Sequence, residues 1–243
     1  MRSSLIALVV AASCAAAPPV QAPNDGEALY RKMEAALAGA KKLEVEFKST
    51  TKGATIQGTF KVDEGNKLEM KVQGTAGVKK YSLELTCDDG KMSLKRSETP
   101  PPPVPLPAQP MLPAPATLTK NVAAALARGG AWLAQEYADG EYRAELERTL
   151  KAQPPPADMT DVTRRHELRN FQLGKAGADG APVTYDMIRT GESLICTTIT
   201  VWIDAKTNRP LKREGAIYLL SADGKKPKDV SSTWAEEYKT KLD

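Results

Sequence analysis

The segment between Leu43 and Leu94 alternates apolar and polar residues in five consecutive runs. In the first run Leu43, Val45 and Phe47 alternate with charged residues, and four similar runs follow, separated by short connections that carry Gly, Asp or Asn. A period of two is typical of a β-strand with one buried face, and short connections let neighbouring strands pair antiparallel. The pattern predicts an antiparallel meander whose apolar face must be covered by another layer.

A second set of strand patterns lies in the C-terminal part of the chain, over residues 166–173, 183–189, 194–204, 211–220 and 230–238. Gly, Asp and Asn residues mark the turns between them. The series of about ten strands is interrupted once, by helical sequence. We expect one α+β domain over residues 23–243, in which both sets contribute to one core, because neither set carries its own helical cover.

A helix is predicted directly after Asn24, which has the capping-box spacing to Glu27. Leu29, Met33 and Leu37 then recur at helical spacing and form one apolar stripe. The interpretation is a helix that packs this stripe against the apolar face of the sheet.

Proline dominates residues 99–116, between the meander and the central helical block. Proline at this density excludes helix and ladder pairing and favours an extended path, so a linker or surface loop is predicted for this insertion, with a ligand for a proline-binding partner as the alternative. Beyond it, three short amphipathic pieces run from residue 117 to residue 150, with glycines at 129 and 130 between the first two. Together with the first helix, these pieces are the expected cover for the sheet.

The first 22 residues have the organisation of an export signal, with Arg2 ahead of an apolar run from Leu5 to Ala12. That run is too short to span a bilayer. Two processing routes remain open. Small residues ahead of Cys14 resemble a bacterial lipoprotein signal, in which this cysteine becomes the lipidated first residue and a membrane tether; alternatively, Ala22 ends the small-x-small pattern of ordinary cleavage. Either route predicts a periplasmic or cell-envelope location.

The two remaining cysteines, Cys87 and Cys196, are predicted to stay unbridged. Cys87 shares the apolar face of its strand with Leu83 and Leu85, whereas Cys196 lies opposite the apolar residues of its own strand. If both strands belong to one sheet, the thiols point to opposite faces and cannot meet the geometry of a disulfide.

No constellation of residues in the sequence supports catalysis. The single histidine, His166, is predicted to lie on the surface near a strand start, and its spacing from Asp158 and Asp161 matches no metal motif. The carboxylates Glu236 and Glu237 are predicted to lie at a turn or solvent face. The chain carries neither a phosphate-binding glycine loop nor a nucleophile elbow. We therefore expect a protein that is not an enzyme, with no cofactor and no metal site.

The charge pattern gives no support for a nucleic-acid partner. The formal net charge of +4 is spread over isolated lysine pairs without a basic block. Aromatic residues make up 5% of the chain, which is few for a surface that stacks on bases. We expect no nucleic acid among the partners.

Two stretches carry a family resemblance. The first is the opening helix with the start of the meander, from Glu27 to Phe47 and from Gly58 to Val62. The second runs from Val201 to Arg213, where a strand ends in Asp, turns through Lys-Thr-Asn-Arg-Pro and resumes with Leu-Lys-Arg. Together they resemble the outer-membrane lipoprotein-sorting family, the LolA/LolB-like periplasmic proteins. The proline-rich insertion departs from that pattern, and no position matches the arginine that locks the lid in the family.

The resemblance implies a strongly curved antiparallel half-barrel whose concave apolar face is covered by helices and holds acyl chains. The implied partner is a lipid or an acylated lipoprotein, bound by a monomeric carrier or, if Cys14 is lipidated, by a membrane-anchored acceptor. The expected cavity residues lie on the apolar face of the meander: Val45, Phe47, Ile56, Phe60, Leu68, Met70, Leu83 and Leu85. The alternative is a non-catalytic structural or sensory envelope module that has a fully packed core and acts through protein contacts.

Overall fold

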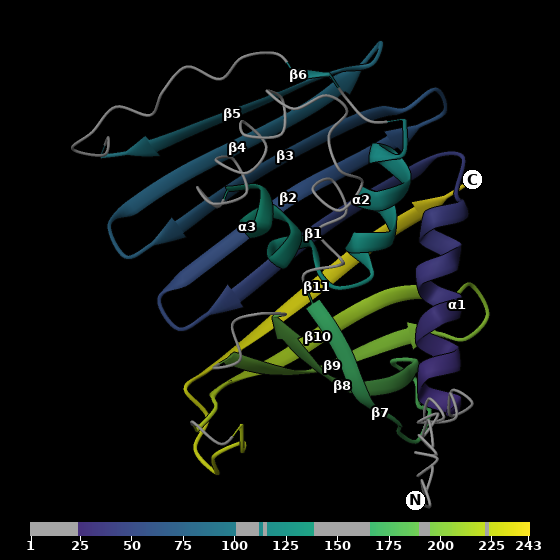
Figure 1. Cartoon of the computed structure of the whole chain (residues 1–243), viewed down its shortest axis with the longest axis vertical. Helices are drawn as coiled ribbons and strands as arrows, with labels where there is room; N and C mark the ends of the chain where they lie inside the picture. The colour runs from purple at the N-terminus through teal and green to yellow at the C-terminus, as the bar shows by residue number, and fades with distance from the viewer. Residues whose placement is uncertain (1–23, 101–111, 114–115, 139–165, 190–194, 222–223) are drawn as a thin grey trace, which may run out of the picture.

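The computed structural model describes residues 24–100, 112–113, 116–138, 166–189, 195–221 and 224–243 (Figure 1). The predictions for the export signal and Cys14, for most of the proline-rich insertion and for the third helical piece at 142–150 lie outside these residues. Among the described residues, no helix combines the length and the apolar character that crossing a membrane requires.

Within the described ranges, eleven strands form one sheet, in the order β6-β5-β4-β3-β2-β1-β11-β10-β9-β8-β7. Every neighbouring pair is antiparallel. The predicted meander is β1 (Leu43–Thr51), β2 (Ala54–Asp63), β3 (Lys67–Ala76), β4 (Lys79–Asp88) and β5 (Lys91–Thr99). The two-residue β6 (Leu112–Pro113) pairs with β5 at the edge of the sheet, where proline is tolerated, so the prediction that the proline-rich insertion excludes ladder pairing is wrong at these two residues. The second set is β7 (His166–Leu173), β8 (Ala181–Arg189), β9 (Ile195–Asp204), β10 (Arg209–Leu219) and β11 (Ser232–Leu242).

The last strand joins the two sets. β11 pairs with the whole length of β1, from Leu43 opposite Leu242 to Thr51 opposite Trp234. The two sets therefore form one curved sheet, which confirms the α+β prediction of a single half-barrel of about ten strands covered by helices (Figure 1).

In the part of the chain that the structure describes, three helices lie on the concave face of this sheet: α1 (Asp25–Gly39), α2 (Leu118–Leu126) and α3 (Gly130–Ala138) (Figure 1). The Asn24 side chain caps α1 by accepting from the Glu27 backbone N–H at 2.9 Å, as its spacing predicts. The same side chain donates to the Phe171 carbonyl on β7 at 2.7 Å, which fixes the start of α1 to the sheet. The predicted stripe is buried at Met33 and Leu37.

Glycines let bulky side chains lie flat across the concave face. The Trp234 ring covers Gly215 on the neighbouring strand, and the Tyr81 ring covers Gly74. A Cβ atom at either glycine would overlap the ring, so the close approach of ring to backbone requires glycine there. Such pairs reduce side-chain bulk inside the curve of the sheet, where space is smallest.

The two cysteines lie on opposite faces, as predicted. The Cys87 thiol belongs to the concave core and donates to the Asn66 carbonyl, while Cys196 lies on the convex side beside Asp186 and Lys226. Both thiols are buried and unbridged. Burial raises the pKa of each.

Two predicted surface residues are in fact buried. Glu236 is 1% exposed, because the alternation along β11 places it on the concave face with Trp234 and Tyr238. The His166 side chain is 7% exposed, because the Trp132 ring meets it edge-on and Glu136 lies 3.9 Å away. In both cases a helix, α3, covers a strand position that sequence alone assigned to solvent.

Candidate functional site

The helix α2 is fastened to the sheet at both ends. At its start, Asn66 on the β2–β3 turn accepts from the backbone N–H and the hydroxyl of Thr119, each at 3.1 Å. The helix's own N-cap residue, Thr117, makes no side-chain capping bond, so Asn66 supplies the missing acceptor from another element. At its end, Arg213 and Tyr30 both donate to the Ala127 carbonyl.

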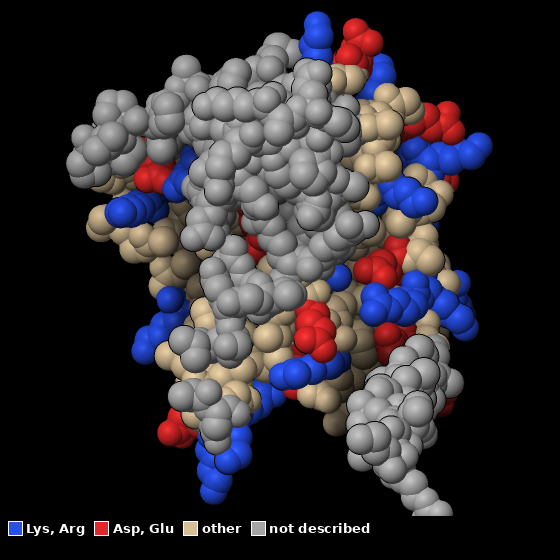
Figure 2. All heavy atoms as spheres, in the orientation of Figure 1, with Lys and Arg blue, Asp and Glu red and all other residues tan. Residues whose placement is uncertain are grey.

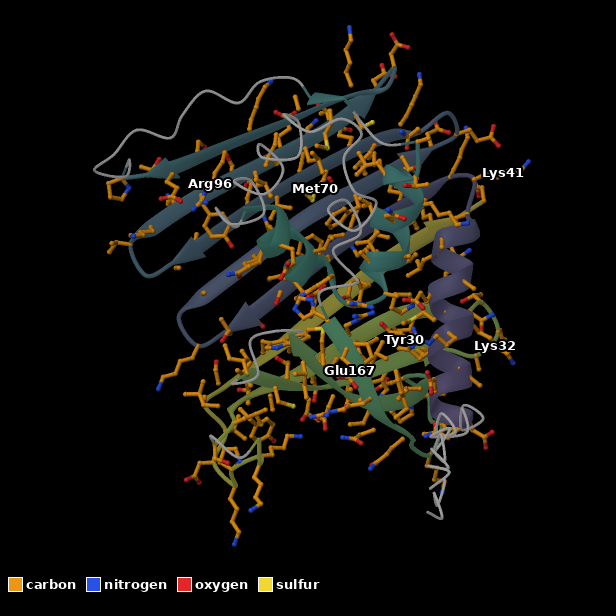
Figure 3. All side chains as sticks on the ribbon, in the orientation of Figure 1. Tyr30, Lys32, Lys41, Met70, Arg96 and Glu167 are labelled. Atoms are coloured by element: carbon orange, nitrogen blue, oxygen red, sulfur yellow. The ribbon has the colours of Figure 1, made fainter. Side chains whose placement is uncertain are left out.

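Arg213 and Tyr30 hold the end of α2 from two other elements, β10 and α1. Tyr30 projects from α1 into the interior between helices and sheet (Figure 3) and is fully buried. Arg213 is fully buried on β10, reaches the Leu126 carbonyl at 3.4 Å as well, and places its guanidinium 5.3 Å from the centre of the Tyr238 ring. A cation directed at the last carbonyls of a helix satisfies acceptors that have no intrahelical partner and complements the helix dipole.

The helix α3 is held at its start by Glu236. Its Oε1 accepts from the Gly130 backbone N–H at 2.6 Å and from the Ala131 N–H at 3.4 Å. Gly129, with φ of +136°, turns the chain between α2 and α3 in a conformation that favours glycine. A carboxylate from the sheet therefore acts as the N-cap of α3.

Arg213 and Glu236 stand opposite each other on β10 and β11. Each side chain serves a helix end, and the described contacts include no ion pair within 4 Å between them. Burial raises the pKa of the Glu236 carboxyl, and the nearby Arg213 charge and the α3 amides only partly oppose that shift. The pair thus places a buried cation under the end of α2 and a titratable acid under the start of α3.

Beside α3, the concave face is hollow. One cavity of about 440 Å³ lies between α3 and strands β1 to β5, and a second of about 310 Å³ lies between α3 and strands on both sides of β11. The two share five lining residues and are together called the α3 groove; the shared residues are Thr51, Ala54, Ile56, Ala131 and Gln135. Tyr81 and Leu83 line the first cavity, and Trp132, Met187 and Trp234 line the second.

The eight expected cavity residues fall into two groups in the structure, those that line the α3 groove and those that lie in the packed core. Ile56 lines both parts of the α3 groove, and Leu83 lines the larger part. The other six belong to the packed core, each at most 4% exposed, and line neither part: Val45, Phe47, Phe60, Leu68, Met70 and Leu85. Met70, for example, lies on β3 behind the helices (Figure 3).

Several groove residues were missed because the sequence prediction considered only the first five strands. Met187, Ile217 and Trp234 come from the second set, where the same period-two pattern marks them as concave. That pattern is the signal by which the sequence could have found them. Trp132 lies on α3, and no local sequence pattern predicts where α3 packs on the sheet.

No family model matches the chain, and no curated protein matches it. Solved structures with a similar fold include MucB in a Pseudomonas aeruginosa MucA/MucB complex, at 14% identity over 89% of this chain and 57% of that chain, with a TM-score of 0.37. This chain therefore spans little more than half the length of MucB.

Two further similar structures cover both chains almost fully. One is a putative outer membrane lipoprotein-sorting protein domain from Vibrio parahaemolyticus, at 11% identity over 88% of this chain and 91% of that chain, with a TM-score of 0.33. The other is a LolA superfamily protein from Nitrosomonas europaea, at 8% identity over 90% and 93%, with a TM-score of 0.26. The family that the sequence resembles is thus found among the similar structures, and the likeness is one of fold.

Proposed function

We propose that this protein is an exported, non-enzymatic carrier or acceptor that holds an acyl chain in the α3 groove. The observation that carries the proposal is an apolar hollow between α3 and an otherwise close-packed concave sheet. Each part of the groove falls within or near the range of about 300–1,000 Å³ in which ligand pockets occur. A packed structural module would fill this space with side chains.

The physical gain comes from moving methylene groups out of water. Each buried methylene contributes about 0.8 kcal/mol, so a chain of about a dozen gains on the order of 10 kcal/mol before the costs of ordering and of moving α3. The lining includes large apolar surfaces, such as Tyr81 at one end and Trp234 at the other, that a chain can contact along its length. The groove therefore suits an extended apolar ligand better than a compact polar one.

The three tryptophans offer a direct test. Trp132 and Trp234 line the groove, whereas Trp202 lies on the convex face under the Lys212 amino group. Stearic acid that carries a doxyl quencher on its chain is expected to quench tryptophan fluorescence in the wild-type protein. The double variant W132F/W234F retains only Trp202 and is expected to lose the quenching.

A substitution that fills the groove gives a second test with a matched control. Ile56→Trp adds bulk at the part of the groove that both cavities share, and Gln57→Trp adds the same bulk one residue away on the convex face. We expect Ile56→Trp to weaken acyl-probe binding about tenfold or more and Gln57→Trp to leave it unchanged. Equal binding by both variants, or no uptake of any acyl probe by the wild type, would favour the packed envelope module that acts through protein contacts.

Export and anchoring are part of the proposal and have their own measurement. The protein is expressed in a bacterial envelope with its own N-terminus, and its intact mass is recorded. A diacylglyceryl mass on Cys14 would make it a membrane-anchored acceptor, whereas a mature chain that begins at Pro23 would make it a periplasmic carrier. A full-length unprocessed mass in the cytosol would contradict both.

A further inference from the structure

The two ends of the sheet differ in how their charges are matched. At the end near the start of β1, acidic and basic side chains alternate along the turns and pair: Lys42 with Asp63, and Lys67 with Asp88. Lys41 lies at this end, and Arg96 lies at the opposite end (Figure 3). The opposite end, where Ala54 stands beside Ala76 and Thr51 beside Trp234, is the end at which the α3 groove lies.

Positive charge gathers at one corner of the groove. Among the described residues, Lys79, Lys80 and Arg96 line the larger cavity together with one acid, Glu98, so these three basic groups and one acid carry a formal charge of +2. Arg96 is paired with Glu98. Lys79 and Lys80 are exposed, and neither makes an ion pair with any described residue. Figure 2 shows blue side chains at this left-hand end of the molecule, with red ones beside them.

In the other part of the groove, the described lining residues carry no comparable charge. The one charged residue among them is Glu236, which is buried and directed at the α3 amides. The groove is therefore polarised: a cationic corner at the β3–β4 turn leads into an apolar interior that ends at Trp132 and Trp234.

We propose that the groove selects an anionic amphiphile, whose phosphate-bearing headgroup lies at Lys79 and Lys80 and whose acyl chain extends beneath α3. This inference rests on the proposed acyl-chain binding and adds the chemical class of the headgroup. Unmatched lysines at a groove entrance attract anions from solution and hold them by charge, whereas the headgroup of a zwitterionic lipid carries a compensating cation. The apolar interior then adds affinity only for an anion that carries a chain.

The test compares two lipids with the same chain: palmitoyl lysophosphatidylglycerol, which is anionic, and palmitoyl lysophosphatidylcholine, which is zwitterionic. Binding to the full-length protein is measured by tryptophan fluorescence below the micelle concentration, at low and high salt. We expect the anionic lipid to bind about tenfold more tightly at low salt, and the preference to shrink at high salt. The double variant K79Q/K80Q is expected to abolish the preference for the anionic lipid without weakening the binding of the zwitterionic lipid.

The matched control is K67Q/K91Q, which removes two exposed lysines at the starts of β3 and β5, at the far end of the sheet. It is expected to keep the preference. Equal affinity for both lipids in the wild type, or a preference that K79Q/K80Q leaves intact, would overturn the headgroup assignment while acyl binding stands. Failure of both lipids to bind would overturn the proposed function itself. Inorganic phosphate that binds alone, and that K79Q/K80Q abolishes, would assign the corner to a free anion and overturn the lipid assignment.

Discussion

The helices α2 and α3 are each nine residues long and lie side by side on the same sheet, yet they cover it differently. α2 buries Leu118, Val122 and Leu126 in the core and is fastened to other elements at both ends. α3 is capped by Glu236 at its start but lies over the groove, with Ala131 and Trp132 only half-buried. The difference indicates that α2 is a fixed part of the core, whereas α3 is the part of the cover that the proposed acyl ligand would displace.

The largest expected effect comes from removing the cation beneath α2. Arg213→Ala leaves the Ala127 and Leu126 carbonyls buried without this donor and creates a cavity, so we expect the free energy of unfolding to fall by about 3–5 kcal/mol. Lys212→Ala, one residue away and directed to the convex face, is expected to change it by less than about 1 kcal/mol. Urea unfolding of both variants measures the difference. A mild effect of Arg213→Ala would mean that α2 is not fastened through this residue.

A smaller and pH-dependent effect is expected beneath α3. The folded pKa of Glu236 is raised, so the stability that this acid contributes is fully present below its unfolded pKa of about 4.3 and is lost as the pH rises through the higher folded pKa. Glu236→Gln removes the titration and keeps an acceptor for the Gly130 N–H. The variant is expected to lose most stability relative to wild type near pH 4 and least near pH 8. Urea unfolding across that range that gives a constant difference would contradict the raised pKa.

The capping bond at the start of α2 has a more modest expected contribution. Asn66→Gly removes the acceptor for Thr119 but tolerates the positive φ of 60°, so we expect a loss of about 1 kcal/mol. Asn66→Asp keeps an acceptor and is the matched control. Thermal unfolding that ranks the two variants equally would show that the side-chain oxygen contributes nothing to α2.

The smallest perturbation uses the unaltered protein. In native-state hydrogen exchange, the backbone amides of α3 are expected to exchange about tenfold faster than those of α2, because α3 packs over a hollow. Addition of an acyl ligand is expected to slow exchange in α3 and to leave α2 unchanged. Equal protection of the two helices, with and without ligand, would remove the distinction between them.

Strand positions could be predicted from the sequence because burial on one face imposes a period of two directly on the residues. The meander from Leu43 onward, the helix after Asn24 and the separation of Cys87 from Cys196 all follow from such local patterns. The groove could be predicted only in part. Ile56 and Leu83 line it, but Val45 and Met70 share their pattern and lie in the packed core.

What the sequence determined by itself is therefore which apolar strand residues face inward. It did not determine what meets them there. Glu236 looks like a solvent-exposed acid until α3 places two backbone amides over it, and Arg213 looks like one charge in a Leu-Lys-Arg run until α2 places its last carbonyls above. An alternating pattern shows on which face of a sheet a side chain lies. The distance between that face and a helix depends on contacts between residues far apart in the chain. Whether an inward residue fills the core or lines a groove was decided by the tertiary structure alone.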